Sequence, residues 1–172
     1  MKTSETGRTT VRRSITVGRS ATDIYAAWRD PASLAVLLRD MVDVTPTERG
    51  THWKMHGVLG TSTEWDAVLS GDLPGRSVEW RAVGDDNRHR SLRIELAPAP
   101  GNQGTEIVLV FEFDPPGGIL GDALSKLFAV PPNTMAGKAL HRFKALAETG
   151  EIPTLRYNTS TREEAVGPGE QK

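Results

Sequence analysis

Cysteine is absent from this chain of 172 residues. Its absence excludes disulfide bonds, thiolate metal ligands and cysteine nucleophiles, and it fits a reducing compartment such as the cytoplasm. An excess of positive charge is absent too, because 21 Lys and Arg face 22 Asp and Glu and leave a net charge of -1. The chain therefore has no basic field with which to neutralise phosphates. We expect a cytoplasmic protein that binds no nucleic acid.

Long apolar runs are also missing. No stretch approaches the roughly 18 apolar residues of a membrane-spanning helix, and Met1–Thr10 is polar, unlike the apolar part of a secretory signal. The sequence thus predicts no integral membrane segment. A weak peripheral membrane contact stays open through the amphipathic stretch Ile119–Phe128, although Lys126 is its one basic residue and attraction to anionic lipid would be small.

Alternating apolar residues are the main signal that the chain does carry. Seven segments place apolar side chains on every second position and are separated by Gly, Pro, Asp and Asn clusters typical of turns. Trp53, Trp65 and Trp80 fall on the apolar side, which indicates a sheet with one dry and one wet face. The predicted strands are Thr10–Val17, Val42–Glu48, Thr51–Gly57, Thr63–Asp72, Arg76–Val83, Arg90–Pro98 and Gly104–Asp114.

Two short helices are predicted after the first strand. Ser20 and Asp23 form a capping pair before a helix that ends near Arg29. Asp30-Pro31 then supplies an N-cap and a proline at the first helical position of the second helix.

A longer amphipathic segment, Gly118–Thr149, closes the pattern and ends at Gly150. Pro131-Pro132 interrupts it, because neither proline donates a backbone hydrogen bond, and Asn133 can cap a new helix there. We expect the segment to be kinked or divided at this point.

The order of elements predicts an α+β domain over residues 10–153. It consists of a seven-stranded, curved antiparallel sheet around a long C-terminal helix, with two short helices after the first strand. Residues 1–9 and 154–172 hold too little apolar material to offset the entropy of ordering them. We expect both ends to be disordered.

Several stretches of this sequence are similar to a known superfamily. They are Ala21–Asp30, Val78–Arg81, Gly104–Glu106, Pro115–Gly121, Arg142–Lys144 and Glu148–Glu151. Together they resemble the START-like (SRPBCC, helix-grip) superfamily, and most of all its bacterial polyketide cyclase/dehydrase and coenzyme Q-binding branch. The resemblance implies the helix-grip, START/Bet v 1-like fold. The basic turn Arg88-His89-Arg90-Ser91 departs from the small, polar turn expected there.

The resemblance also implies a class of ligand. Members of the superfamily bind lipids, sterols, quinones or polyketides, and only some are enzymes, so the expected partner is a hydrophobic small molecule and no cofactor is expected. The ligand would lie between sheet and final helix, although the tryptophans are equally suited to filling a core. The predicted lining is Trp53, Met55, Trp65, Trp80, Leu92, Ile94, Leu109, Phe111, Leu124, Phe128 and Leu140.

Polar contacts to such a ligand have three candidates. Arg13 falls in an apolar row, so it lies either at the rim or beside a charged partner or ligand head group. Tyr25 and His141 could reach inward from the first and last helices, but packing or surface roles suit them as well. No catalytic motif maps onto the chain, and the catalytic residues stay unknown.

For the charged residues on the predicted solvent-exposed face, a surface role is a simpler explanation than a functional site. His52 and His56 are separated by roughly 13 Å along a strand, too far to share a metal ion, so no metal site is expected. Glu79 and its charged neighbours should form cross-strand ion pairs, unless a bulge reverses the alternation. Val108 and Val110 add apolar character to the same face, which leaves a homodimer contact open.

Three functions remain after these arguments. The first is noncatalytic binding or carriage of a lipid, quinone or polyketide-like molecule in the cavity. The second is a cyclase or dehydrase reaction on a polyketide-like substrate in the same place. The third is a structural or interaction module whose core is filled.

Overall fold

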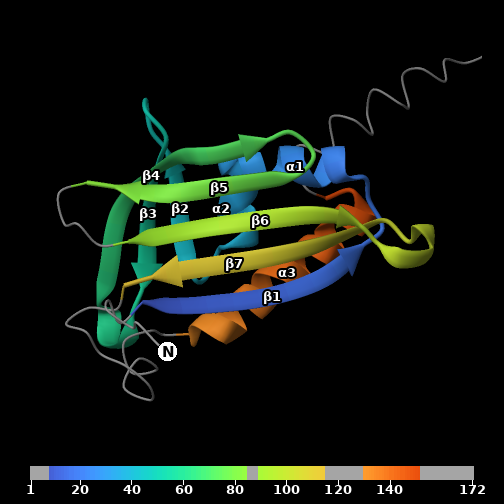
Figure 1. The fold of residues 1–172 in the computed structure, drawn as a ribbon. Coiled ribbons are helices and arrows are strands. Elements are labelled where there is room, and N and C mark those ends of the chain that lie inside the picture. The colour runs from blue at the N-terminus through green and yellow to red at the C-terminus, as the bar shows by residue number, and fades with distance from the viewer. Residues whose placement is uncertain (1–7, 85–88, 115–129, 152–172) are drawn as a thin grey trace, which may run out of the picture.

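The computed structural model describes residues 8–84, 89–114 and 130–151. Seven antiparallel strands form one sheet in the order β1-β7-β6-β5-β4-β3-β2 (Figure 1). The curved sheet wraps around α3, as expected for a helix-grip fold. The strands are β1 (Thr9–Val17), β2 (Val42–Pro46), β3 (Thr51–His56), β4 (Ser62–Leu73), β5 (Ser77–Val83), β6 (Arg90–Pro98) and β7 (Thr105–Phe113).

Among the described residues, three helices cover one face of the sheet (Figure 1). α1 (Ala21–Arg29) packs on β5 and β6, α2 (Pro31–Leu37) packs on β2, and α3 (Pro132–Thr149) packs along β1. Short 3-10 turns occupy Val58–Gly60 and Pro100–Asn102. The predicted fold class is therefore confirmed, including the two short helices after the first strand.

Local caps, formed by side chains at Ser20 and Asp30 and by the backbone at Gly150, account for three predicted helix ends. The Ser20 hydroxyl accepts a hydrogen bond from the Asp23 amide, and the Asp30 carboxylate accepts from the amides of Ala32 and Ser33. At the other end of the chain, Gly150 adopts a φ of 75°, the left-handed conformation that ends α3. Each cap is a local feature, which is why the sequence pattern located these ends.

The start of α3 differs from the expectation in one detail. The helix begins at Pro132 with Pro131 in the capping position, so Asn133 lies in the first turn and does not cap it. Proline is favoured there because its missing amide would have no helical partner in any case. The predicted helical residues before Val130, including Leu124 and Phe128, lie outside the described residues.

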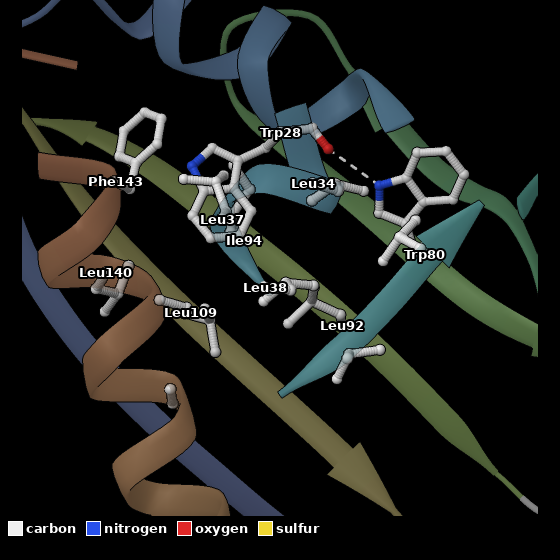
Figure 2. Close-up of a cluster of buried hydrophobic side chains, with 14 of the residues drawn as sticks. Trp28, Leu34, Leu37, Leu38, Trp80, Leu92, Ile94, Leu109, Leu140 and Phe143 are labelled. Atoms are coloured by element: carbon white, nitrogen blue, oxygen red, sulfur yellow. Dashed lines mark hydrogen bonds between the residues drawn. The ribbon is translucent and has the colours of Figure 1, made fainter. Parts of the chain in front are cut away.

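The core lies between the sheet and the three helices (Figure 2). Trp28 on α1 and Phe143 on α3 pack with ring centroids 5.4 Å apart. The Trp28 indole N–H has no hydrogen-bond partner among the described residues, and Figure 2 shows its nitrogen on the side facing Phe143.

One bulge changes the alternation of β4. Leu69 pairs with Trp80 and Gly71 with Glu79, so Ser70 is an extra residue. Beyond the bulge Asp72 pairs with Val78, a residue of the inner face, whereas simple alternation from Leu69 would place Asp72 outside. Asp72 therefore turns toward α1, where its carboxylate accepts hydrogen bonds from the Tyr25 hydroxyl and, at 3.0 Å, from Arg29.

The outer face carries ion pairs among the residues predicted to form them, but of the three contacts that follow only the one between Glu79 and Arg93 crosses between strands. Glu79 contacts Arg81 at 2.6 Å and Arg93 at 3.9 Å, and Arg93 also contacts Glu95 at 3.0 Å. Val110 is only 3% exposed on this face, so less apolar surface remains for a dimer contact than its sequence position suggested.

Candidate ligand-binding cavity

An apolar cavity of about 40 Å³ lies between the sheet and the start of α3. Its floor comes from β2, β3, β4, β6 and β7, and its walls come from the end of α2 and the first two turns of α3. The described lining residues are all apolar: Leu38, Val42, Trp53, Met55, Trp65, Leu92, Leu109, Phe111, Pro132, Met135, Ala136 and Ala139. Such a surface favours hydrocarbon or an aromatic ring over water.

Trp53 and Trp65 form one wall of this cavity. They pair directly across β3 and β4, and their rings stack with centroids 6.0 Å apart at 21°. The Trp53 indole N–H donates to the Thr51 hydroxyl at 2.6 Å, and that hydroxyl donates to the Ala67 carbonyl at 3.1 Å. These buried bonds hold Trp53 in one orientation, so the wall is rigid.

A second, smaller cavity of about 10 Å³ lies against the same aromatic pair. Trp53, Trp65, Leu92 and Phe111 line both cavities, and the smaller one adds Arg90. Arg90 is only 6% exposed, and its guanidinium carbon lies 5.0 Å from the centre of the Trp65 ring. A cation over an indole face is attracted by the ring's negative potential.

Arg90 is the residue that the sequence reasoning missed. The sequence interpretation treats the basic turn before β6 as a departure from the resemblance and assigns Arg90 to neither face of the sheet. The signal was nevertheless present, because Arg90 shares its parity with Leu92 and Ile94 on the inner face. Alternation extended from Leu92 by two residues, to the next inward position, places a cation inside.

The structure brings together six of the predicted lining residues and separates others. Trp53, Met55, Trp65, Leu92, Leu109 and Phe111 line the larger cavity. Trp80 lines only the smaller one, and its indole N–H donates to the Trp28 carbonyl at 3.0 Å (Figure 2). Ile94 and Leu140 are buried in the core but line neither cavity.

None of the three candidate polar contacts lines either cavity. The Arg13 side chain is exposed, and its guanidinium lies against Gly137 on α3. The Tyr25 hydroxyl is engaged by Asp72, a hydrogen bond that raises the pKa of the tyrosine and lowers that of the aspartate. His141 is exposed on α3.

A Ser, a His and a Glu do meet on the outer face, but not as a catalytic relay. His89 Nε2 lies 3.2 Å from the Ser91 hydroxyl and 3.3 Å from Glu112. A relay needs the nucleophile and the acid on opposite ring nitrogens, whereas here both contact the same one. These three residues therefore form a local polar network and are not arranged for acyl transfer.

His52 is likewise committed to neighbours on the outer face. Its Nδ1 lies 2.8 Å from Asp66 and its Nε2 lies 3.3 Å from Glu64. The hydrogen bonds to Asp66 and then Glu64 raise the pKa of His52. Among the described residues, no group of three or more His, Asp and Glu side chains is arranged to hold a metal ion.

Polar contacts hold the C-terminal half of α3 to the rest of the domain. Lys144 donates to the Thr16 carbonyl at 2.7 Å, and Arg19 donates to the Ala147 carbonyl at 2.7 Å. Arg142 donates to the Leu37 and Arg39 carbonyls at 3.0 and 2.9 Å. The cavity-facing side of the first half of α3 presents Met135, Ala136 and Ala139, so its attachment there is apolar.

Known proteins share this arrangement. Residues 8–148 match a family described as polyketide cyclase/dehydrase and lipid transport. A protein from Deinococcus radiodurans is 28% identical with a TM-score of 0.62, and the match covers 83% of this chain and 99% of that one. A START superfamily protein from Mycobacterium smegmatis is 14% identical with a TM-score of 0.58, and the match covers 85% of this chain and 98% of that one. No curated protein matches.

Because the Mycobacterium smegmatis protein is only 14% identical, its likeness to this chain shows a shared fold and nothing about function. Within the described residues, no helix has both the length and the apolar character that crossing a membrane requires.

Proposed function

The chain belongs to the polyketide cyclase/dehydrase and lipid transport family, and from this we propose that it binds a hydrophobic small molecule between the Trp53–Trp65 pair and the start of α3. One observation carries the proposal: the described lining of the larger cavity is entirely apolar and includes two stacked indole rings. Removing a ligand's apolar surface from water would drive binding at about 25 cal/mol per Å², less the cost of association.

The ligand would have to enlarge the cavity. Its volume of about 40 Å³ exceeds the roughly 10–15 Å³ that one water needs but is far below the roughly 300–1,000 Å³ typical of drug-sized ligands. Met55 and Met135 can change rotamer at little cost, since methionine is unbranched. The first half of α3 can tilt outward while the contacts of Lys144, Arg142 and Arg19 hold the second half in place.

Binding is favoured over catalysis by the chemistry of the lining. A cyclase or dehydrase reaction needs a group at the ligand that moves a proton. None of the described residues around the larger cavity carries such a group. The cyclase alternative therefore has no residue in the described part of this cavity to act through.

A filled-cavity variant tests the proposal. Ala136→Leu places a larger side chain in the space that the ligand would use, and Ala145→Leu makes the same change on the exposed side of α3. The probe is N-phenyl-1-naphthylamine, a neutral apolar fluorophore, titrated against each variant. We expect Ala136→Leu to weaken binding by about tenfold or more, ~1.4 kcal/mol, and Ala145→Leu to leave it unchanged.

The melting temperature of each variant serves as the folding control. If the wild type does not bind the probe, or if both variants bind it as the wild type does, the cavity is not the binding site and the core is simply filled.

A further inference from the structure

Arg90 is a buried cation beside the apolar cavity. Arg90 is only 6% exposed, whereas arginines on the outer face, such as Arg81, keep their side chains largely in water. Burying a guanidinium costs free energy unless the protein or a ligand supplies compensating contacts. Arg90 has contacts within the protein, and its five N–H donors can serve a further partner beside them.

The position of Arg90 relates it to the ligand cavity. The two cavities share four lining residues, Trp53, Trp65, Leu92 and Phe111, and Arg90 lies beyond them over the Trp65 ring. A molecule that lies along this aromatic wall and extends into the smaller space therefore meets the guanidinium. The apolar part of the site would then end at a fixed positive charge.

The chemistry of the guanidinium selects a class of ligand. It carries five N–H donors in a planar fork, so it can serve a ligand oxygen alongside contacts within the protein. The fork matches a carboxylate in a bidentate manner, and such charge-assisted hydrogen bonds are strong where water is excluded. A neutral hydrocarbon would gain nothing from this contact.

From this arrangement we propose that the ligand is a hydrophobic acid, whose apolar body occupies the cavity and whose anionic oxygen is held by Arg90. The inference rests on the proposed function, because it assigns the polar end of the same site. It predicts a preference for carboxylic acids over their neutral esters.

A matched pair of probes tests the preference directly. 11-(Dansylamino)undecanoic acid and its methyl ester differ only in the charge of the terminal group. We expect the wild type to bind the acid at least about tenfold more tightly than the ester at neutral pH. In Arg90→Gln the preference should vanish while the affinity for the ester stays within about twofold of the wild type.

Two further variants keep the test decisive. Arg93→Gln removes an outer-face arginine of the same strand and should leave the preference intact. Arg90→Lys keeps the charge but loses the fork, so it should retain part of the preference and covers the case in which Arg90→Gln unfolds. Equal wild-type affinity for acid and ester, or a preference that survives in both Arg90 variants, overturns this inference alone. Failure of both probes to bind the wild type overturns the proposed function as well.

Discussion

At the scale of single residues, the inner-face tryptophans have distinct environments. Trp53 and Trp65 line the larger cavity, whereas Trp80 packs in the core and ties the sheet to α1 through its hydrogen bond to the Trp28 carbonyl. We expect Trp80→Ala to lower the free energy of unfolding by about 3–5 kcal/mol, as for other large-to-small core changes. Trp80→Phe should cost less, since it loses the hydrogen bond but keeps most of the volume.

Urea denaturation monitored by far-UV circular dichroism measures both changes. A loss below about 1 kcal/mol for Trp80→Ala would mean that the ring lines open space.

The raised pKa of His52 implies that the stability of the fold depends on pH, with a definite sign. Hydrogen bonds to Asp66 and Glu64 raise its pKa in the folded state, so the imidazolium stabilises the fold. This contribution is fully present below the unfolded pKa of about 6.5 and is lost as the pH rises through the folded value. The stability difference between wild type and His52→Gln should therefore be larger at about pH 5.5 than at about pH 9.

Denaturation midpoints of the two proteins at both pH values check this expectation. Because the pair is exposed, 1 M NaCl should reduce the difference at low pH. A difference that does not change with pH would show that the carboxylates do not govern His52.

At the scale of elements, two glycines in close contacts should respond in opposite ways to alanine. Gly137 lies inside α3, and an added Cβ would meet only the movable tip of Arg13 at 3.2 Å. We expect Gly137→Ala to stabilise the protein by about 0.5–1 kcal/mol, because alanine is the better helix former. Gly104 has a φ of 108°, and its Cβ would overlap the Val17 carbonyl.

Gly104→Ala should therefore destabilise by about 2 kcal/mol or more, since neither backbone can move without breaking the contact. Thermal melts of the two variants provide the comparison. Destabilisation by Gly137→Ala would indicate that the Arg13 side chain is held in place more firmly than its exposure suggests.

At the scale of the whole molecule, we propose that the folded unit ends shortly after α3. The Glu151 amide donates to the Leu146 carbonyl at 2.8 Å and completes the helix end begun by Gly150. The family match likewise ends at residue 148. A chain ending at Pro153 should melt within about two degrees of the full chain, because it keeps every contact of that cap. A drop of several degrees would show that residues 154–172 contribute to the fold.

The sequence alone was sufficient for the strands, for the helix ends at Ser20, Asp30 and Gly150, and for the inner face of the sheet. Alternation of apolar residues identifies a half-buried strand, and Ser20, Asp30 and Gly150 act within a few residues of themselves. These features depend on local geometry, which a linear pattern records. The resemblance to a known superfamily then added the kind of fold, which the match over residues 8–148 supports.

Only the tertiary structure decided which inward residues surround space and which fill it. Trp53 and Trp80 share the same parity, yet only Trp53 lines the larger cavity, because α1 packs over Trp80. The bulge at Ser70 directs Asp72 toward α1, and Arg90 at the start of β6 lies over Trp65 of β4, although β5 separates these strands in the sheet. Cavity volume and buried charge depend on residues distant in the chain that pack together, and periodicity within one strand carries no record of that packing.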